Sequence, residues 1–422
     1  MLDIKFIREN PELIQAAATK KRADFKVEEL IEVDTKRLGL LAAVEALRRQ
    51  QNEASQKIAT ITDHDVRNQL IVSMKAVKDK LSAEEAALAE VMKSWQRLML
   101  AVPNLPDISV PDGASDADNQ EIRTWGEKTA LAFPPRDHVD LLTSLDLADF
   151  ERGAKVSGFR GYFLKNAGAR LEWGLFQYAW QFFQARGGFI PLSAPSLVNR
   201  EAFLGTGYLP AGEEDLYKTQ DDQFLAGTAE VATMAYYADE ILPAESLPQK
   251  FLAFSPCFRR EAGSHGKDTR GLFRVHEFFK LEQVVLCEAS HETSVRLHEE
   301  LTANSEAFLQ SLNLPYRVVV NCGADLGQGQ VKKYDLEAWM PSENTYRETH
   351  SSSYFHDFQT RRLNIRYRDA EGKLRFVHSL NNTAVAAPRI LAHLVENNQQ
   401  ADGSVKIPEV LIPFVGTDIL KR

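Results

Sequence analysis

The segment Phe258-Arg259-Arg260-Glu261-Ala262-Gly263 continues through His265-Gly266-Lys267-Asp268-Thr269-Arg270-Gly271 to Leu272-Phe273-Arg274-Val275-His276-Glu277-Phe278. It predicts a strand, a loop and a second strand. The ordinary explanation for four arginines and a lysine in one hairpin is a solvated charged loop. Arg259 and Arg274, however, lie beside aromatic residues that favour burial. A buried guanidinium needs an anionic partner, and its planar fork suits phosphate.

Two more polar clusters follow toward the C-terminus. The first is Asn344-Thr345-Tyr346-Arg347-Glu348-Thr349-His350-Ser351, followed by Asp357-Phe358-Gln359-Thr360-Arg361-Arg362, and the second is Asn381-Asn382-Thr383-Ala384, followed by Pro388-Arg389-Ile390. Proline is favoured in the first turn of a helix, so Arg389 should project from a helix start. The chain has neither a Gly-x-x-x-x-Gly-Lys-Ser/Thr nor a Gly-x-Gly-x-x-Gly segment. Side chains would therefore have to hold the phosphates of any nucleotide.

The elements around these clusters indicate the fold class. We expect a helix over residues 170–186, strands over 250–260 and 272–286, a helix over 290–312 and a last helix over 388–397. Strands that are neighbours in sequence, with helices between such pairs, indicate an antiparallel sheet with helical layers. The sequence therefore predicts an α+β fold.

The first hundred residues differ in composition from the rest of the chain. Between Asp34 and Leu100 there is no proline and a single glycine, Gly39, as in long helices. Apolar residues recur with heptad spacing, interrupted only by Gln51 and Glu84. The two seams are Leu40, Val44, Leu47, Gln51, Ala54, Ile58 and Ile61, and then Leu70, Met74, Val77, Leu81, Glu84, Leu88, Val91, Trp95 and Leu98.

The residues between the seams predict how the two helices are connected. Thr62-Asp63-His64-Asp65 is rich in residues that cap helices and stabilise turns, so we expect an antiparallel hairpin with helices of about 40 Å each. Taken alone, such a hairpin is equally a dimerisation coiled coil, a spacer or an arm that binds a partner.

A proline-rich segment, Pro103 to Gly113, ends the second helix. With 422 residues the chain is long enough for two or three domains. We expect an N-terminal helical domain over residues 1–102, a linker over 103–125 and a second domain over 126–422.

Composition limits the classes of partner and compartment. With 50 Lys and Arg against 59 Asp and Glu, the net charge is −9, so no global basic field attracts nucleic acid and any RNA contact must be local. The three cysteines, Cys257, Cys287 and Cys322, lack zinc-finger spacing. No apolar stretch is long enough to cross a bilayer. These features favour a reducing, cytoplasmic location without disulfides or structural zinc.

Together these segments resemble class II aminoacyl-tRNA synthetases, and among them bacterial-type seryl-tRNA synthetases, over nearly the whole chain. Gly188-Phe189 through Pro195 is similar to the first class II motif, whose proline lies at the dimer interface. Phe258-Arg259-Arg260-Glu261 with Arg274-Val275-His276-Glu277-Phe278 is similar to the second, and Ala387-Pro388-Arg389 to the third. Their order and spacing, with Thr228-Ala229-Glu230 and the N-terminal hairpin, argue against chance similarity.

The resemblance implies a class II catalytic domain, an antiparallel sheet flanked by helices, that binds ATP in a bent conformation. It assigns Arg259 to the α-phosphate, Phe278 to stacking on the adenine, and Arg389 to the γ-phosphate. The implied catalytic residues are Arg259, Arg389 and Glu348. The implied ATP-binding set is Arg259, Arg260, Glu261, Arg274, Val275, Phe278, Glu348, Thr349, His350, Ser351 and Arg389.

The resemblance also implies a metal site and an amino-acid site. Glu348 and Ser351 would bind Mg²⁺, with the carboxylate supplying the charge that so hard a cation needs. Serine would contact Thr228, Ala229, Glu230, Glu282 and Thr383. The alternative explanations are a structural ion pair with a neighbouring arginine for Glu282 and a simple turn hydroxyl for Thr383. Such a site activates serine because attack of its carboxylate on the α-phosphorus needs positive charge fixed in advance.

In this family the hairpin reaches the long variable arm of tRNA(Ser). From Lys36 to Arg97 the chain has 11 basic and 8 acidic residues, a net charge of +3 against −9 overall, which agrees in sign. The candidates for phosphate contact are Arg48, Arg49, Lys57, Lys75, Lys78 and Lys80. The resemblance implies a homodimer with tRNA(Ser) as substrate, and it leaves tRNA(Sec) open as a second acceptor.

Four positions depart from the family's usual residues. His350, Ser352 and Tyr354 stand where serine, cysteine and asparagine are common, and Arg260 replaces a frequent serine. His350 is equally explained as a packed histidine. Two alternatives to the synthetase remain. One is a paralogue that passes the activated amino acid to a carrier, which would have little use for a complete hairpin. The other is a non-catalytic RNA-binding protein, which would be free to lose Arg259, Glu261, Glu348 or Arg389.

Overall fold

The computed structural model describes residues 1–263, 266 and 268–422, so His265 and Lys267 of the arginine-rich loop lie outside the described residues. Two compact units divide the chain, one from Leu2 to Pro103 and the other from Asn104 to Arg422. Residues 120–125, expected in the linker, form strand β1 (Gln120–Trp125) of the second unit. Each unit is described by itself below.

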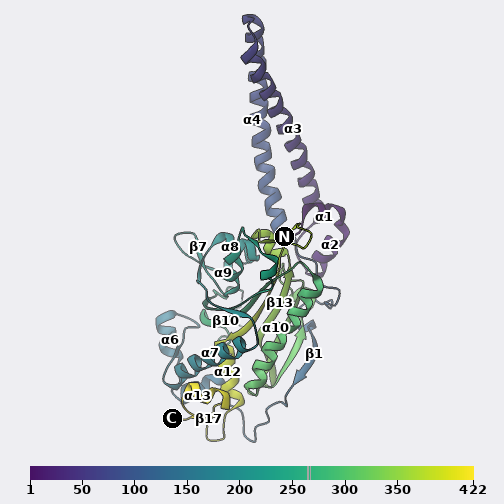
Figure 1. Cartoon of the computed structure of the whole chain (residues 1–422). Coiled ribbons are helices and arrows are strands. Elements are labelled where there is room, and N and C mark those ends of the chain that lie inside the picture. Colours follow the sequence, from purple (N-terminus) through teal and green to yellow (C-terminus); the bar gives the residue numbers. More distant parts are fainter. Residues whose placement is uncertain (264–265, 267) are drawn as a thin grey trace. The chain divides into compact units, whose positions relative to one another are not determined.

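The first unit is helical and contains α1 (Ile4–Glu9), α2 (Pro11–Lys20), α3 (Val27–Thr60) and α4 (His64–Ala101). The antiparallel hairpin expected from the heptads is present, and Figure 1 shows α3 and α4 side by side along it. The seam is confirmed, since Val44, Ala54, Leu81 and Leu98 are buried and the other predicted seam positions are partly buried between exposed neighbours.

The helices of the hairpin are longer than the expected 40 Å. At about 1.5 Å per residue, the 34 residues of α3 span about 51 Å and the 38 of α4 about 57 Å. The difference arises because both helices extend beyond their heptad seams: α3 starts at Val27, before Leu40, and α4 runs from His64 to Ala101, beyond Leu70 and Leu98. The turn is where the sequence placed it: the Asp63 side chain accepts hydrogen bonds from the Asp65 and Val66 amides and caps α4.

A buried carboxylate joins three helices at the base of the hairpin. Asp34 of α3 is 1% exposed and forms ion pairs with Arg8 of α1, at 3.0 Å, and Arg37, at 2.8 Å. The Arg37 guanidinium in turn lies 4.8 Å from the ring centre of Trp95 in α4. Because a buried charge is costly without its partners, this cluster fixes the base of the hairpin to the first helix.

The second unit is built on an eight-stranded sheet. Its strands in spatial order are β1, β11 (Tyr316–Val320), β12 (Lys332–Met340), β13 (Thr345–His356), β16 (His378–Ala386), β10 (Glu277–Cys287), β9 (Gln249–Phe258) and β4 (Phe189–Ser193). All neighbours are antiparallel except β4 and β9. The predicted α+β antiparallel sheet is confirmed.

Three helices cover one face of the sheet: α7 (Ala167–Ala185), α10 (His291–Ser311) and α12 (Ala387–Asn397). Figure 1 shows α10 alongside the strands of the sheet. The main hydrophobic core lies between these helices and the sheet and includes Phe183, Leu301 and Leu391. The helices expected over 170–186, 290–312 and 388–397 thus agree with the structure to within three residues. The opposite face of the central strands is left for the site.

The remaining elements of the second unit are short. They are α5 (His138–Ser144), β2 (Ala148–Asp149), α6 (Phe150–Ser157), β3 (Phe163–Leu164), β5 (Leu197–Asn199), α8 (Arg200–Thr206), β6 (Tyr217–Lys218), β7 (Gln223–Leu225), α9 (Glu230–Met234), β8 (Ile241–Leu242), α11 (Phe358–Arg362), β14 (Arg366–Arg368), β15 (Leu374–Phe376), β17 (Val405–Lys406), α13 (Ile412–Val415) and β18 (Ile419–Leu420). The three cysteines are buried free thiols.

The strand expected over residues 272–286 begins five residues later than the pattern suggested. Leu272 and Phe273 are buried, but as an irregular segment rather than a strand. The Leu272 amide donates to Nε2 of His138 at 3.2 Å, and Phe273 packs edge-on against His138 at 5.5 Å. The apolar residues at this point therefore anchor the loop to α5, and ladder pairing starts only at Glu277.

Candidate active site

Two β-bulges aim polar side chains at the open face of the sheet. In β13, Glu348 and His350 face consecutive residues of β12, so Thr349 is the extra residue. This bulge puts Glu348 and Ser351, three residues apart, on the same face of the sheet. In a regular strand they would point to opposite faces.

The second bulge lies between β10 and β16. Leu281 pairs with Val385 and Glu282 with Thr383, so Ala384 is the extra residue. Glu282 and Thr383 are therefore direct cross-strand neighbours, at the separation where side chains interact.

These side chains line one cavity of about 330 Å³. The sequence-predicted residues Glu230, Arg259, Glu282, Glu348, Ser351 and Thr383 all contribute to it. Residues not predicted also line it, including Tyr208, Lys280, Gln330 and Asn381. The cavity contains both acidic and basic groups, which suits a small zwitterionic or phosphorylated ligand.

Two buried carboxylates line this cavity. Glu230 is 3% exposed and accepts hydrogen bonds from the Tyr208 hydroxyl at 3.0 Å and the Gln359 amide at 2.7 Å. Glu282 is 2% exposed, and one of its oxygens lies 2.6 Å from Nζ of Lys280. Burial raises the pKa of both carboxyl groups, while their hydrogen-bond donors and Lys280 oppose the shift.

Thr228 and Ala229 complete the Thr-Ala-Glu segment at the start of α9. The Thr228 hydroxyl accepts hydrogen bonds from the Glu230 amide at 3.3 Å and from Lys280 Nζ at 3.4 Å. Ala229 is fully buried behind it, so its small side chain lets the segment pack against the sheet. The segment thus fixes Glu230 and Lys280 relative to each other.

Glu348 and Arg389 form an ion pair at the other side of the cavity. Nη1 of Arg389 lies 3.0 Å from Oε1 of Glu348 and donates to its carbonyl oxygen at 3.3 Å. Burial works to raise the pKa of Glu348, but the charges of Arg389, Lys333 and Arg259 together lower it to about 2. The side chain is still 44% exposed toward solvent, so an incoming ligand can reach it. Glu348 is therefore an ionised, accessible oxygen donor at neutral pH.

Arg259 lies between the cavity and an aromatic ring. Its guanidinium is 5.4 Å from the ring centre of Phe278, and its Nε and Nη2 donate only long hydrogen bonds, of 3.4 and 3.3 Å, to the Gly227 carbonyl. No carboxylate within the described ranges forms an ion pair with Arg259. Its charge is thus available to an anionic ligand.

The second arginine of the hairpin has protein partners. Arg274 forms ion pairs with Glu261 at 3.0 Å and with Asp268 at 3.1 Å, and Arg347 also contacts Asp268, at 2.6 Å. The buried Val275 follows Arg274 in the chain. The sequence expected an anionic partner for Arg274, and the structure provides it within the hairpin itself.

Of the predicted ATP-binding residues, only Arg259, Glu348 and Ser351 line this cavity. Three of the others have side chains engaged elsewhere in the protein. Arg260 is exposed, and its Nη1 donates to the Glu214 carbonyl at 3.0 Å. The Thr349 hydroxyl is buried and donates to the Leu336 carbonyl at 3.0 Å, because Thr349 is the bulge residue. His350 is fully buried on the helix-covered face, where its Nε2 lies 3.1 Å from the Ala384 carbonyl.

The hairpin residues proposed for phosphate contact are all exposed: Arg48, Arg49, Lys57, Lys75, Lys78 and Lys80. Among them Arg48 is engaged within the hairpin, since its Nη2 lies 2.7 Å from Oε1 of Glu85 on the facing helix. For the other five, no ion pair is seen in the part of the chain that the structure describes.

Comparison with known proteins now decides the family. A family model described as the seryl-tRNA synthetase N-terminal domain matches residues 1–106, and one described as the tRNA synthetase class II core domain (G, H, P, S and T) matches residues 216–398. A serine–tRNA ligase from Deinococcus radiodurans is 46% identical over 99% of this chain and 98% of that protein. The chain belongs to the seryl-tRNA synthetase family.

Solved structures of seryl-tRNA synthetases share this architecture. The enzyme from Pyrococcus horikoshii, complexed with ATP, superposes with a TM-score of 0.90 at 37% identity, covering 100% of this chain and 99% of that one. The cytoplasmic serine–tRNA ligase from Naegleria fowleri, in complex with AMP, has a TM-score of 0.86 at 32% identity, covering 100% and 99%. Among the described residues, no helix is long and apolar enough to cross a membrane.

The departures from the usual seryl-tRNA synthetase pattern have a structural explanation. His350, Ser352 and Tyr354 alternate along β13 on the face covered by α10. The Ser352 hydroxyl accepts from Thr302 of α10 at 3.0 Å, and the Tyr354 hydroxyl donates to Asp107 at 2.7 Å. Burial lowers the pKa of His350 to about 3, so it is a neutral packed histidine. These substitutions repack the core rather than the cavity.

Sequence reasoning missed Lys280, Tyr208 and Gln359, which hold the two buried carboxylates. Lys280 had a usable signal, because it precedes Glu282 by two residues in a strand and therefore shares its face. Gln359 lies in a polar cluster singled out above, but nothing in the sequence connects it to Glu230, which it reaches from α11. Tyr208 had no signal, since it reaches Glu230 from the segment after α8.

Proposed function

We propose that this chain activates L-serine with ATP to seryl-adenylate and transfers the seryl group to the 3′ end of tRNA(Ser). Serine–tRNA ligation is the activity class of its family. The observation that carries the finer proposal is a single cavity containing two buried carboxylates, the available guanidinium of Arg259 and the ionised Glu348.

The serine would bind between Glu230 and Glu282. Its ammonium group needs an anionic partner, and Glu230 is a buried carboxylate beside the open cavity. Its hydroxyl would hydrogen-bond to Glu282 and Thr383, which are cross-strand neighbours. Alanine would leave these buried polar groups unpaired, at a cost of about 1–3 kcal/mol per group. Threonine would have to be excluded by shape.

Lys280 would act on the substrate carboxylate. Its ammonium lies 2.6 Å from Glu282 and 3.4 Å from Thr228, within the same cavity. Lys280 and Arg259 together supply two positive charges where the serine carboxylate approaches the α-phosphate. These charges offset the repulsion between the carboxylate and the triphosphate. We assign no general base, because orientation and charge suffice for both steps.

ATP would be held by side chains rather than by a glycine-rich loop. Arg259 is proposed for the α-phosphate, Phe278 for stacking on the adenine, and Arg389 for the γ-phosphate. Glu261 and Val275 would border the adenine. Arg274, through its ion pairs with Glu261 and Asp268, would hold the hairpin in position.

Glu348 and Ser351 are proposed ligands of Mg²⁺. The two residues fit a hard cation because both present oxygen to the same cavity and the low pKa of Glu348 keeps its carboxylate charged. When bound, the ion would neutralise phosphate charge and fix the bend of the triphosphate. Arg389 and Lys333 beside Glu348 would be shielded from each other by that carboxylate.

The N-terminal domain, residues 1–102, is proposed to bind the tRNA, and residues 126–422 to carry the catalysis. The exposed basic residues of the hairpin would contact tRNA phosphates. We propose a cytoplasmic homodimer with its interface around Pro195, where Ile190 and Leu197 are exposed near an edge strand of the sheet. Aminoacylation of a tRNA(Sec) transcript tests whether this tRNA is a second acceptor.

Pyrophosphate exchange with each amino acid in turn tests this proposal. We expect serine-dependent, Mg²⁺-dependent exchange and charging of tRNA(Ser) transcripts. Exchange with another amino acid and none with serine would refute the specificity. Serine exchange without any tRNA charging would instead favour transfer to a carrier.

A further inference from the structure

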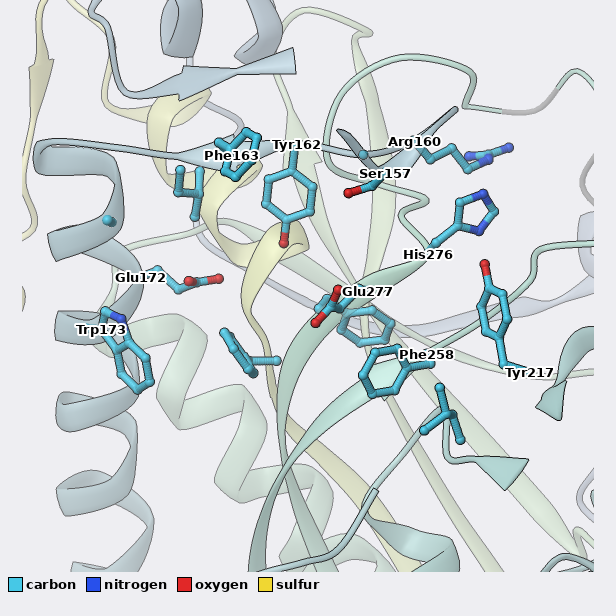
Figure 2. Close-up of a pocket in the computed structure, with 16 residues that line it drawn as sticks. Ser157, Arg160, Tyr162, Phe163, Glu172, Trp173, Tyr217, Phe258, His276 and Glu277 are labelled. Atoms are coloured by element: carbon cyan, nitrogen blue, oxygen red, sulfur yellow. The ribbon is translucent and has the colours of Figure 1, made fainter. Parts of the chain in front are cut away.

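A second cavity, of about 510 Å³, shares no lining residue with the serine cavity. Its walls come from α7, from the segment joining α6 to β3, and from β6, β7, β9 and β10 (Figure 2). The function proposed above uses only one of its lining residues, Phe278. The cavity therefore needs an explanation of its own.

Glu172 of α7 is the unusual residue of this cavity. Its side chain is 7% exposed, and its Oε1 has no hydrogen-bond partner among the described residues. Burial raises the pKa of Glu172 to about 7, with no nearby charge to oppose the shift. A buried, unpartnered carboxylate is costly, so a ligand that pairs with it would relieve that cost.

Two further polar groups converge on the same space. Figure 2 shows the Glu172 carboxylate, the Tyr162 hydroxyl and the Glu277 carboxylate turned toward the middle of the cavity. Burial raises the pKa of Tyr162, and the charges of Glu172 and Glu277 raise it further, as expected for a phenol beside two carboxylates. The cavity thus offers two carboxyl groups and a phenolic hydroxyl.

The remaining wall is aromatic. Phe163, Trp173, Tyr217, Phe258 and Phe279 all line the cavity. Trp173 is 52% exposed, so its ring is reachable from solvent. Aromatic faces attract cations through their quadrupoles, and carboxylates supply the opposite charge. The combination excludes anions and favours a cation with an apolar stem.

The basic residues that line this cavity, Arg160 and His276, are not cationic partners of Glu172. Nη1 of Arg160 donates to the carbonyl oxygens of Asp268 and Arg274, each at 2.8 Å, and His276 Nδ1 lies 2.9 Å from the Arg259 carbonyl. Neither group forms a hydrogen bond or ion pair with Glu172 among the described residues. A bare metal ion is a poor candidate, because no cluster of three ligating side chains occurs in the described part of the chain.

We propose that this cavity binds an organic ammonium group, with Glu172 as its anionic partner and the aromatic rings around its stem. The group has two chemical sources. It is either a free alkylamine or polyamine, or the side chain of a lysine from a second copy of this chain. The two sources share one chemistry and are separated by experiment.

The first experiment measures binding of hexylammonium chloride to the full chain by calorimetry at pH 8. Hexanol is the neutral control of equal length. The variant is Glu172→Gln, which keeps the volume and removes the charge, and the matched control is Glu201→Gln on the exposed face of α8. We expect hexylammonium to bind at least about tenfold more tightly than hexanol, and Glu172→Gln alone to weaken it by about tenfold or more.

The pH dependence gives a second readout. Alkylammonium ions stay charged below pH of about 10. The other titratable or charged groups that line this cavity are Tyr162, Tyr217, Arg160, His276 and Glu277. Since Glu172 takes up a proton as pH falls through about 7, affinity should decrease between pH 8 and pH 6 in the parent chain. In Glu172→Gln it should stay nearly constant.

A lysine from a second copy would give a different pattern. Hexylammonium would then fail to bind the assembled protein, while Glu172→Gln, but not Glu201→Gln, would raise the dimer dissociation constant measured by sedimentation by about tenfold or more. Either pattern supports an ammonium site. The proposal is overturned if hexylammonium binds no better than hexanol and Glu172→Gln leaves the dissociation constant unchanged. Serine-dependent exchange, measured on the same variants, keeps this outcome separate from the proposed activity.

Discussion

Glu348 and Ser351 face the same cavity although three residues separate them along β13. Thr349 is the extra residue of a bulge, and its hydroxyl is buried against the Leu336 carbonyl. In a regular strand, residues three apart lie on opposite faces of the sheet. The bulge puts Glu348 and Ser351 on the same face, so that both oxygen donors line one cavity. A strand without this irregularity could not form the proposed metal site from these two residues.

Glu348→Gln should abolish Mg²⁺-dependent pyrophosphate exchange, with a loss of at least about 100-fold in kcat/KM, because the charged oxygen proposed for the cation is gone. The low pKa of Glu348, about 2, means that this carboxylate is ionised throughout the working range. Protonation of Glu348 should therefore cause no decrease in the exchange rate above pH 5 in the parent chain. A variant that still exchanges at the parent rate would contradict the metal assignment. Glu343→Gln, at the turn before β13, is the control.

Glu282→Ala should lose serine activation far more than ATP binding. The carboxylate lies 2.6 Å from Lys280 and opposite Thr383, where we propose that serine binds. We expect kcat/KM for serine to fall by about 100-fold or more, with the ATP dissociation constant within about threefold of the parent. Equal losses of serine activation and ATP binding would identify Glu282 as a structural ion pair. Thermal unfolding of the variant separates that case from general unfolding.

Replacing residues 40–92 by a short linker should leave serine adenylation nearly intact and abolish charging of tRNA(Ser). The shortened chain keeps Asp34, Arg37 and Trp95, the cluster at the base of the hairpin. Pyrophosphate exchange measures adenylation. The amount of aminoacyl-tRNA, which is stable in acid, measures charging. Normal charging by the shortened chain would show that the hairpin is only a spacer.

Neutralising exposed cations of the hairpin should flatten the salt dependence of tRNA binding. Arg49→Gln and Lys57→Gln should each lower the slope of log K against log salt by about one unit at most. Arg48→Gln should have a smaller effect, since Arg48 already pairs with Glu85 at 2.7 Å. Filter binding at several salt concentrations measures the slopes. If all variants and the parent have equal slopes, these residues do not contact the tRNA phosphates, and the tRNA binds elsewhere on the protein.

Glu172→Gln should stabilise the protein at pH 8 but not at pH 5. An acid whose pKa is raised on folding, here from 4.5 to about 7, binds its proton more tightly in the folded state. Stability is therefore lost as pH rises between these values, by about 1–3 kcal/mol. Urea unfolding at the two pH values, with Glu201→Gln as control, measures the difference. An equal change at both pH values would contradict this assignment.

Much of the fold could be predicted from periodicity. The heptad seams fixed the hairpin, because a two-helix contact has few alternatives once its apolar positions are known. The helix start at Val27 could not be predicted, since residues 27–35 belong to the globular base and do not follow the seam. The late start of β10 was missed because the apolar residues Leu272 and Phe273 favour a strand and a buried loop equally.

The site was predicted only in part for a similar reason. Motif residues such as Arg259 and Glu282 could be named, but the face on which each side chain lies depends on the two bulges. Period-2 alternation puts Glu348 with His350, whereas the bulge separates them and sends His350 into the core. A bulge leaves no clear signature in a single sequence.

The cluster at the base of the hairpin has a mechanical consequence. Because Asp34 joins α1 to α3, and Arg37 stacks on Trp95 of α4, the small helices and the hairpin should turn as one rigid lever. With an arm of about 50 Å, a rotation of about 10° at the base would sweep the tip through about 9 Å. A modest pivot at the base would thus become a large displacement at the tip, and under the function proposed above it would let the hairpin reach tRNAs of different shape.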